Sequence, residues 1–446
     1  MNVLFISLGC DKNLVDSEVM LGLIRDRGYM LTNDENEADI AVINTCSFIH
    51  DAQQESVNTI LEMAQLKDEG QLKGLIVTGC LAQRFKEEIM TEIPQVDAVI
   101  GATAYDEIAS VMDKVAAGEE NITSFKDISY LPHTDTKRVV TTGGYFSYLK
   151  IAEGCDKHCS YCIIPSLKGN FRSVPMEEIL QDAKDLAEKG VKELNIVAQE
   201  TTVYGVDLYG KKMLHELLRK FCAVEGIEWI RLLYCYPEEI YDELIETIKT
   251  EPKICHYLDL PIQHASDRIL KKMGRRTDRR ALETIIAKLR KEIPDIALRT
   301  SLITGFPGET RLEHEELMDF VRNMRFDRLG VFTFSAEDGT PAAKFEGQID
   351  EEVKEARRDE LMTLQQQIAF EAAKKMKDRQ LPVLIEGKIP EDGVYIGRTY
   401  KDAPNVDGYI FVNAPWELMS GDIVPVRVTG ASDYDLIGDV VDESAE

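Results

Sequence analysis

Three closely spaced cysteines form the clearest chemical signal in this sequence. Cys155, Cys159 and Cys162 stand in the segment EGCDKHCSYCIIP and are called the loop cysteines below. A 4Fe-4S cluster usually takes four cysteine thiolates, and this loop supplies three. One iron would therefore keep an open position, as in catalytic rather than structural metal sites. The spacing predicts an iron–sulfur site that a small molecule bearing an amine and a carboxylate can chelate.

The same loop could instead form a zinc knuckle, with His158 as the fourth ligand. A structural zinc site is closed and usually tetrahedral, which leaves no position for a substrate. The loop directly follows a strand-like apolar segment, residues 146–151, and active sites of parallel barrels lie at the carboxyl ends of strands. This position favours the open iron–sulfur site.

Three further cysteines lie far apart in the sequence, but each of them follows an apolar segment. Cys10, Cys46 and Cys80, called the sheet-edge cysteines below, directly follow predicted strands in LFISLGC, IAVINTC and GLIVTGC. Parallel strands would bring the three thiols to one sheet edge, where α/β proteins bind ligands. We therefore expect a second three-cysteine metal site; the alternative is three small residues at crowded turns. The remaining cysteines show no such pattern and are predicted to be core residues: Cys222, Cys235 and Cys255.

Composition and charge limit the classes to which the protein can belong. The chain has 446 residues, 44% hydrophobic and 29% charged, and its 52 basic and 79 acidic residues give a net charge of −27. These values predict a folded protein of two or three domains. The N-terminal segment MNVLFISLGC lacks a basic flank, and no run approaches the roughly 18 apolar residues of a membrane span. We therefore expect a cytoplasmic protein with reduced thiols and no membrane partner.

The first block of the chain, residues 1–136, alternates short apolar runs with amphipathic stretches of helical period. The predicted buried strands are residues 3–8, 40–43 and 75–77. The predicted helices are residues 16–26, 52–66 and 84–93. This alternation predicts a doubly wound α/β domain that carries the sheet-edge cysteines at its loops.

The second block, residues 137–378, follows a polar linker expected at residues 134–144. Its predicted strands are residues 146–151, 193–197, 229–233, 257–259, 297–303 and 328–332. Its predicted helices are residues 176–189, 214–222, 238–249, 267–273 and 279–291, followed by one long charged helix at residues 351–379. Six strand–helix units predict a parallel barrel, or a partial (βα)6 barrel, within an overall α/β protein.

The third block, residues 379–446, has short β-type runs separated by Gly and Pro turns. The predicted strands are residues 382–386, 394–399, 409–412 and 423–429, which suggests a small antiparallel β-barrel. From residue 381 to 446 there are 13 acidic and 4 basic residues, a balance of −9. A domain that grips tRNA should present a basic face, so this charge favours a basic protein partner. The alternative is a solvated acidic face without a partner.

The spacing CxxxCxxC, with an aromatic residue before its last cysteine, resembles the signature of the radical S-adenosylmethionine (SAM) superfamily. The resemblance implies that the reduced cluster cleaves SAM to a 5′-deoxyadenosyl radical, which abstracts hydrogen from an unactivated C–H bond. Residues 198–201 resemble the superfamily's GGE-type motif, with only the glutamate retained. Residues 301–309 resemble its GxIxGxxE stretch, with Ser for the first Gly and the Glu one place late. The predicted SAM contacts are Tyr161, Gln199, Glu200, Arg299 and Gly305.

These predicted SAM contacts have different expected roles. Tyr161 would form an aromatic wall against the adenine. Glu200, with Gln199 beside it, would bind the amino group, and Arg299 would pair with the carboxylate in a charge-assisted bond. Each could instead be a turn residue or an ordinary surface group.

The order of a three-cysteine α/β domain, a CxxxCxxC barrel and a small β-barrel resembles the methylthiotransferase family over essentially the full chain. SLGCDKNLVDSE (residues 7–18) and YLKIAEGCDKHCSYCIIPSLKGNFRS (residues 148–173) resemble its RimO branch, and the last segment resembles a TRAM domain. The tRNA-modifying branch typically has Gln-Met-Asn after its first cysteine, where this chain has Asp11, Lys12 and Asn13.

The resemblance implies a transferase that inserts a methylthio group at Cβ of an aspartate in small ribosomal subunit protein twelve. It implies two 4Fe-4S clusters, one at the loop cysteines and one at the sheet-edge cysteines. One SAM would methylate a sulfur held at the second cluster, and another SAM would yield the radical. A flavodoxin or ferredoxin is implied as electron donor. The alternatives are a tRNA adenosine methylthiotransferase and a non-catalytic, metal-bearing ribosome-binding protein.

Overall fold

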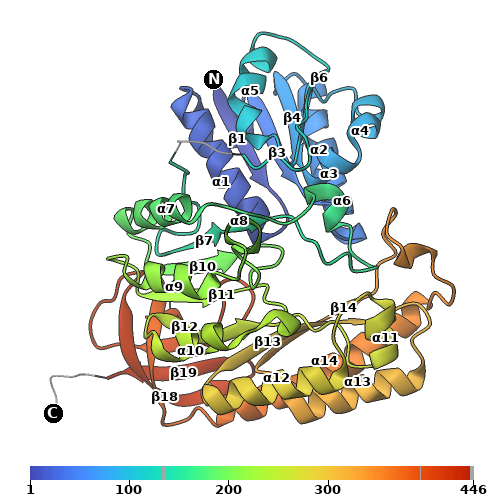
Figure 1. Ribbon diagram of the computed structural model, residues 1–446. Helices are drawn as coiled ribbons and strands as arrows, with labels where there is room; N and C mark the ends of the chain where they lie inside the picture. The colour runs from blue at the N-terminus through green and yellow to red at the C-terminus, as the bar shows by residue number, and fades with distance from the viewer. Residues whose placement is uncertain (133–136, 392, 442–446) are drawn as a thin grey trace.

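The computed structural model describes residues 1–132, 137–391 and 393–441. Three units follow one another along the chain: an N-terminal α/β unit, a central sheet with its helices, and a small C-terminal barrel (Figure 1). The domain boundaries expected after residues 136 and 378 remain predictions. Residues 133–136, where the expected linker begins and the first boundary falls, lie outside the described residues, as do residues 442–446.

The N-terminal unit is built on a six-stranded, fully parallel sheet in the order β2-β1-β3-β4-β5-β6. Its strands are β1 (Asn2–Ser7), β2 (Met30–Thr32), β3 (Ile40–Thr45), β4 (Gly74–Gly79), β5 (Ala98–Gly101) and β6 (Ile122–Ser124). Its helices are α1 (Asp11–Asp26), α2 (His50–Asp68), α3 (Cys80–Arg84), α4 (Lys86–Glu92) and α5 (Ile108–Ala116).

Helices cover both faces of this sheet, which confirms the doubly wound prediction. Successive strand residues point to opposite faces. Val42 of β3 accordingly joins Ile24 of α1 in one buried cluster, while the next residue, Ile43, joins Ile60 of α2 in another. All residues of β3 and β4 are buried, as expected for strands covered on both sides.

The three predicted strands and three helices of this unit are present, with shifted ends. The predicted helix at residues 84–93 is two helices, α3 and α4, because the backbone at Phe85 leaves the helical region. Helix α1 begins at Asp11, five residues before its predicted start, with Cys10 as its N-cap residue. A polar first turn hid this start, although it places residues 11–13 directly beside Cys10.

The central unit has six parallel strands in the order β14-β13-β12-β11-β10-β7, and all six were predicted. The strands are β7 (Phe146–Lys150), β10 (Glu193–Val197), β11 (Trp229–Leu232), β12 (Ile254–Asp259), β13 (Ala297–Thr304) and β14 (Arg328–Thr333). Among the described residues, no bridge joins the edge strands β7 and β14, so the sheet is an open partial barrel.

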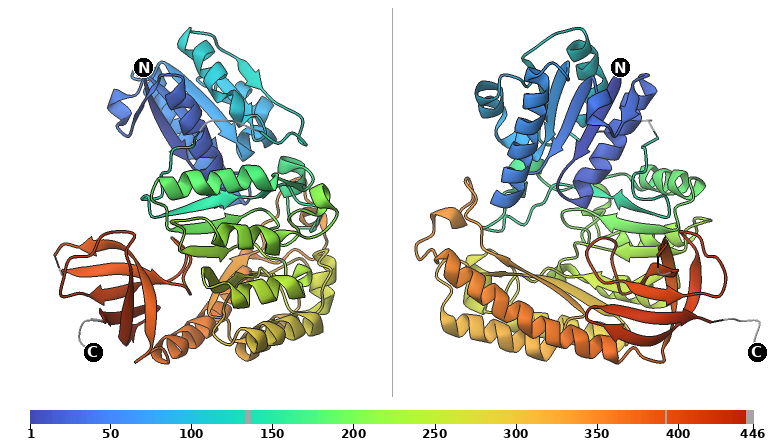
Figure 2. Two further views of the ribbon diagram at one scale, coloured as in Figure 1. Left: turned by 60° about the vertical axis from the view of Figure 1, so that its left-hand side comes forward. Right: turned by 180° about the vertical axis from the view of Figure 1, so that it is seen from behind.

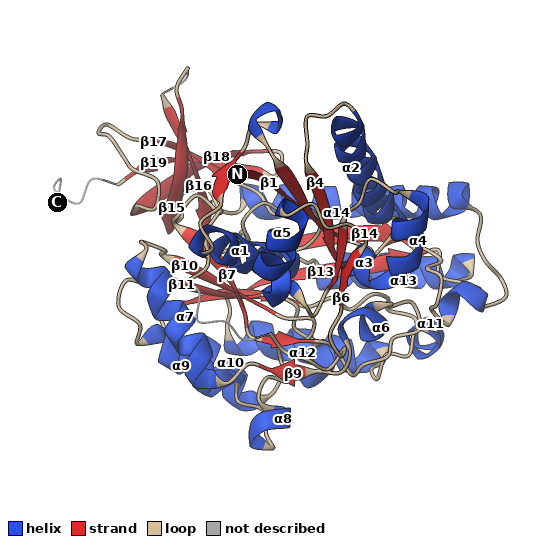
Figure 3. Ribbon diagram, turned by 90° about the horizontal axis from the view of Figure 1, so that it is seen from above, coloured by secondary structure: helices blue, strands red, loops and turns tan. Residues whose placement is uncertain are grey.

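Helices line the convex side of this sheet, as Figures 1 and 3 show. The longer ones are α7 (Met176–Glu188), α9 (Leu214–Cys222), α10 (Asp242–Thr250), α12 (Arg279–Glu292), α13 (Arg311–Met324) and α14 (Glu351–Lys374). Shorter elements are β8 (Ala152–Glu153), α6 (Ile164–Lys168), β9 (Arg172–Ser173), α8 (Val206–Tyr209) and α11 (Asp267–Lys272). The sequence analysis did not predict α13, and the long helix α14 ends at Lys374 rather than at residue 379.

The C-terminal unit is a closed five-stranded barrel in the order β15-β16-β17-β19-β18. Its strands are β15 (Gln380–Ile389), β16 (Val394–Thr399), β17 (Ile410–Asn413), β18 (Ile423–Ser432) and β19 (Asp435–Val440). Four of the five strand pairs are antiparallel, and the β17/β19 pair is parallel. The strand β19 was not predicted.

The C-terminal barrel docks against the concave face of the central sheet (Figure 2). Leu384 of β15 packs in one buried cluster with Trp229 and Tyr257 of the sheet. At the same interface, Glu193 of β10 accepts hydrogen bonds from Arg231 at 2.8 Å and from Arg398 of β16 at 2.6 Å. All three side chains are fully buried.

Glu193 is therefore a negative charge shared by two buried guanidinium groups, and Glu386 is a second partner of Arg398. Burial alone would raise the pKa of Glu193, but Arg398 and Arg231 outweigh it and hold the pKa below its ordinary value. We expect Glu193→Gln to lower the free energy of unfolding by about 3–5 kcal/mol, because it leaves buried positive charge uncompensated. Urea unfolding would measure the loss. The exposed Glu243→Gln on α10 is the matched control, and equal stability of the two variants would contradict this role.

Candidate active site between two groups of cysteines

The loop cysteines lie where the chain leaves the first strand of the central sheet. Gly154, with φ of +80°, makes the turn into the loop, and a Cβ there would lie 2.2 Å from the Asn170 carbonyl oxygen. The backbone N–H of Cys155 donates to the Gly169 carbonyl at 3.1 Å. Cys155 and Cys159 are buried, whereas His158 between them is exposed. His158 therefore does not face the buried thiols, as a fourth zinc ligand would.

Burial perturbs the thiols of two loop cysteines, Cys155 and Cys162. It raises the pKa of Cys155 to about 11 and that of Cys162 to about 12. Metal coordination supplies the positive charge that such thiolates need. Their donor chemistry and depth therefore fit a cluster with three protein ligands.

Arg275 provides a second observation that fits a cluster at this place. Its side chain is only 1% exposed, and one guanidinium nitrogen donates to Glu238 at 3.1 Å. Its Nε and Nη1 atoms are buried without any hydrogen-bond partner among the described residues. The guanidinium lies over the ring of Tyr236, 4.2 Å from its centroid, and the Tyr236 hydroxyl is 4.0 Å from Cys159 Sγ. Unused donors beside a thiol suit the sulfur atoms of a cluster.

The sequence analysis missed both Arg275 and Tyr236. Arg275 belongs to a run of arginines that looks like the solvated start of a helix. Its burial depends on the segment after α11, which packs beneath the loop: the Ser160 N–H donates to the Met273 carbonyl at 2.9 Å. No local sequence signal marks this contact.

Glu200, the predicted partner of the SAM amino group, lies at the carboxyl end of β10. Burial is the main cause that raises its pKa to about 7, and Lys157 of the cysteine loop is 3.8 Å away. Its Oε2 atom has no hydrogen-bond partner among the described residues. The neighbouring Gln199 donates to Glu153 at 2.5 Å, and its own carbonyl oxygen is likewise unpartnered within this part of the chain. Both side chains offer free acceptors for an ammonium group.

Tyr161 lies against a small apolar cluster that includes Met273, Phe306 and Phe334. It is half-buried, and it stands next to Cys162 in the loop. The predicted contact between its ring and the adenine of SAM remains a prediction.

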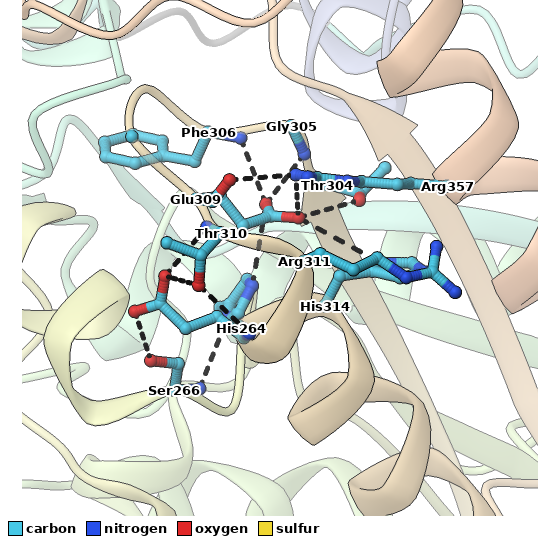
Figure 4. A network of polar contacts seen from close by, with 12 residues as sticks. His264, Ser266, Thr304, Gly305, Phe306, Glu309, Thr310, Arg311, His314 and Arg357 are labelled. Carbon is cyan, nitrogen blue, oxygen red and sulfur yellow. Dashed lines mark hydrogen bonds and ion pairs between the residues drawn. The ribbon is translucent and has the colours of Figure 1, made fainter.

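The carboxylate of Glu309 lies at the centre of the hydrogen bonds in the loop after β13 (Figure 4). The Glu309 carboxylate accepts hydrogen bonds from the backbone N–H groups of Gly305 at 2.7 Å and Phe306 at 3.1 Å. It also pairs with Arg357 of α14 at 2.9 Å and lies 3.6 Å from His264. Glu309 stands one position later than the glutamate of the expected motif, and its carboxylate stabilises the loop itself.

Gly305 is required by the fold of this loop. Its φ is +72°, and a Cβ would lie 2.3 Å from Cγ of Lys354. Its N–H is engaged by Glu309, so a contact with SAM through this residue remains a prediction.

Arg299 lies on β13, where Asp259 accepts a hydrogen bond from it at 2.9 Å. Asp407 of the C-terminal barrel is 3.5 Å from its Nε atom. The guanidinium is thus balanced by two carboxylates of the protein. Its predicted pairing with the SAM carboxylate remains a prediction.

The sheet-edge cysteines follow β1, β3 and β4, which are adjacent in the sheet. Cys46 comes directly after β3, and Cys80 is the first residue of α3. Gly9, with φ of +92°, brings the Cys10 loop so close that an added Cβ would lie 2.8 Å from the Cys46 Cβ. The structure thus brings together three residues that span 70 positions of the sequence, from Cys10 to Cys80.

Side-chain amides connect the loops that carry these cysteines. Asn13 of α1 donates to the carbonyl oxygens of Leu8 at 2.8 Å and Thr45 at 3.0 Å. Asn44 in turn donates to the Asn13 carbonyl at 3.0 Å, and Thr45 donates to the Thr78 carbonyl at 2.5 Å. These bonds connect the ends of three strands at the sheet edge. Sequence spacing alone did not identify Asn13 in this role.

Burial raises the pKa of Cys80 to about 12 and also raises that of Cys46. Within residues 1–132, 137–391 and 393–441, no three His, Cys, Asp or Glu side chains close around a single metal ion. The loops that carry the sheet-edge cysteines are adjacent. Their thiols would suit a polynuclear group, which is larger than a single ion.

The two groups of cysteines are joined by buried charges. Helix α6, which starts two residues after Cys162, contacts α3, which starts at Cys80. Lys168 of α6 lies 3.2 Å from Asp16 of α1, and Lys150 of β7 donates to Glu153 at 2.7 Å. Burial would raise the pKa of Glu153, but Lys150 and Lys168 hold it below its ordinary value.

A second contact fixes the N-terminal unit from another side. Arg84 of α3 pairs with Glu337 of the segment after β14 at 3.1 Å, and Gln53 of α2 donates to the same carboxylate at 2.6 Å. Glu337 is only 5% exposed. The sheet-edge cysteines are thus held against the carboxyl ends of the central strands by ion pairs from both flanks.

Comparisons with known proteins match the same three units. The uncharacterized protein family UPF0004 matches residues 2–101, the radical SAM superfamily matches residues 149–321, and the TRAM domain matches residues 379–441. The chain is 69% identical to the ribosomal protein uS12 methylthiotransferase RimO of Lachnoclostridium phytofermentans, over 98% of this chain and 99% of that protein. It is 50% identical to RimO of Acetivibrio thermocellus, over 99% and 98% of the two chains.

The chain belongs to the RimO family. The predicted family resemblance, fold class and enzyme class are thereby confirmed. As a radical SAM enzyme, a RimO-family protein uses a 4Fe-4S cluster and SAM. None of the helices in the described part of the chain is long and apolar enough to cross a membrane.

Solved structures share the fold of this RimO-family chain at low sequence identity. The radical SAM methyltransferase TsrM of Kitasatospora setae has a TM-score of 0.54 at 14% identity, covering 74% of this chain and 72% of that one. The cobalamin-dependent SAM radical enzyme OxsB has a TM-score of 0.52 at 14% identity, covering 81% and 56%. These likenesses concern the fold alone.

The contacts around Gly79 generate a prediction about the sheet-edge cysteines. Its φ is +94°, and an added Cβ would lie 2.4 Å from the Asn44 side-chain oxygen and 2.5 Å from the Thr45 carbonyl. We expect Gly79→Ala to displace the loop that carries Cys46, and therefore to lower both the thermal midpoint and the iron retained after reconstitution.

Gly118→Ala is the matched control for this prediction. Gly118 has a similar φ of +85° but nothing within 4 Å of its Cβ position. Its substitution should cost only the backbone strain, about 1–2 kcal/mol, and should leave the iron content unchanged. Equal losses of stability and iron in both variants would show that strain, and not the contact between loops, is responsible.

Proposed function

We propose that this chain inserts a methylthio group at Cβ of an aspartate in ribosomal protein uS12, using SAM and two 4Fe-4S clusters. The observation that carries the proposal is the pairing of two three-cysteine groups at one domain interface. Each group supplies three cysteine thiols, and each lies at the carboxyl ends of parallel strands. Full-length relatives named for this activity support the choice of substrate.

The loop cysteines would hold the first cluster. When bound, this cluster and SAM supply a 5′-deoxyadenosyl radical that can abstract hydrogen from an unactivated C–H bond. The chain contributes buried thiols as ligands, Arg275 as a donor toward their sulfur atoms, and Glu200 with Gln199 as acceptors for the ammonium of SAM. Apolar packing around Tyr161 would exclude water from the adenine side.

The sheet-edge cysteines would hold the second cluster, which would carry the sulfur to be transferred at its open position. The contacts of Asn13, Gly9 and Gly79 support this assignment, because they bring the three cysteine-bearing loops together. Lys168, close to Cys80, would offset the negative charge of the thiolates. We also propose a flavodoxin or ferredoxin as the electron donor, since cleavage of SAM needs a low-potential electron.

Charge supports a basic protein rather than tRNA as the substrate. Residues 381–446 carry a net charge of −9, and the whole chain carries −27. An acidic surface repels phosphates and attracts basic proteins such as those of the ribosome.

Iron analysis tests the assignment of two clusters. Cys46→Ala and Cys155→Ala should each lose about half of the iron and sulfide of the reconstituted protein, because each removes one of three thiolates from a different cluster. The double variant should lose nearly all. Cys222→Ala, outside both groups, is the control and should keep the full content. Full iron in Cys46→Ala would contradict a second cluster.

The reaction itself separates the two groups further. With SAM, dithionite and uS12, we expect Cys155→Ala to form no 5′-deoxyadenosine. Cys46→Ala should still form it but should not yield the methylthio adduct, because only the transferable sulfur is lost. Mass spectrometry of uS12 measures the adduct. An unmodified uS12 together with a methylthio adduct on tRNA adenosine would overturn the proposed substrate.

A further inference from the structure

Lys12 occupies an unusual position between the two groups of cysteines. It lies in the first turn of α1, two residues after Cys10, and is only 8% exposed. Its ammonium nitrogen is 3.1 Å from the centroid of the Tyr234 ring. Tyr234 follows β11 at the carboxyl end of the central sheet. The contact therefore joins the N-terminal unit to the central unit. A cation is thereby held where the two units meet.

No carboxylate in the described part of the chain forms an ion pair with this cation. Three lysines are buried in the described part of the chain: Lys12, Lys168 and Lys354. Lys168 lies 3.2 Å from Asp16, and Lys354 lies 2.6 Å from Glu351. Lys12 has no ion pair among the described residues, although lysines are almost never buried unless paired. This difference indicates that its anion comes from another molecule.

The two carboxylates that bind Tyr234 have hydrogen-bond partners other than Lys12. Asp11 accepts a hydrogen bond from the Tyr234 hydroxyl at 3.2 Å. Asp259 accepts one from the Tyr234 backbone N–H at 3.0 Å and another from Arg299 at 2.9 Å. Lys12 is thus left with a ring face on one side, which stabilises a cation without neutralising it.

The platform beneath Lys12 is rigid. Tyr234 has a φ of +57°, a left-handed conformation that is costly for a residue with a bulky side chain. Such strain persists only where surrounding contacts enforce it, and it concentrates at functional sites. Here the enforcing contacts are the bonds of Tyr234 to Asp11 and Asp259. The ammonium of Lys12 therefore has a defined place next to Cys10.

We propose that Lys12 binds the side-chain carboxylate of the target aspartate and thereby selects aspartate over asparagine. The inference rests on the proposed function and names the group that positions its substrate. The Cβ to be modified is one bond from the carboxylate carbon, so anchoring that carboxylate at Lys12 places Cβ beside the sheet-edge cysteines. Three other cations of the site are paired with carboxylates: Arg299 with Asp259, Lys157 with Glu239 and Arg275 with Glu238.

A binding cycle with two substrates tests this role. The iron-loaded protein and its Lys12→Met variant would be titrated anaerobically with labelled uS12 and with uS12 carrying asparagine at the target position. Lys12→Met should weaken binding of the aspartate form about 10- to 100-fold, as for loss of a charge-assisted hydrogen bond. It should change binding of the asparagine form by less than about twofold. Lys12→Arg should retain part of the selectivity, because it keeps the charge.

The controls separate recognition from folding. Iron content and thermal midpoint of each variant show whether both cysteine groups remain intact. Lys114→Met, an exposed lysine of α5, should bind both substrates like the unaltered protein. The inference would be overturned if Lys12→Met weakened the binding of both forms of uS12 equally, or weakened the binding of neither. If the unaltered protein binds uS12 but leaves it unmodified, the proposed function fails and this inference fails with it.

Discussion

Parallel strands bring the loops that follow them to one edge of a sheet, and both groups of cysteines in this protein depend on that geometry. In the N-terminal unit the edge assembles three thiols from three strands, whereas in the central unit one loop supplies all three. In both places the protein offers three thiolates where a 4Fe-4S cluster takes four ligands. The missing ligand leaves a coordination position for a small molecule, and the remaining features of the site serve that position.

The two groups of cysteines lie near each other only because the N-terminal unit is held against the central unit. Buried ion pairs provide this alignment: Lys168 and Lys150 with Asp16 and Glu153 on one flank, and Arg84 with Glu337 on the other. Buried pairs of this kind add little net stability compared with apolar packing, but breaking one is costly. They therefore favour one relative arrangement of the units over others, which the proposed reaction between two clusters would require.

The C-terminal barrel is attached to the central sheet by the same kind of contact. Glu193, Arg231 and Arg398 join it to the concave face, and Asp407 reaches Arg299 there. Through Asp407, the side chain of Arg299 takes part in docking this barrel. The loop after β13 is comparable, since Glu309 holds backbone N–H groups that the motif alone would assign to a ligand.

Local order in the sequence determined much of this protein: the two cysteine groups, the six central strands, the order of the three units and the family. Such features can be predicted from the spacing of cysteines and the periodicity of apolar residues, because both are properties of a short segment of the chain. Only the tertiary structure decided which charges are buried and what faces them. Arg275 looked like a solvated arginine, and Lys12 like part of a polar turn, until residues more than 100 positions away covered one with a cysteine loop and the other with Tyr234. Burial and pairing arise from contacts between distant segments, so no local pattern could have shown them.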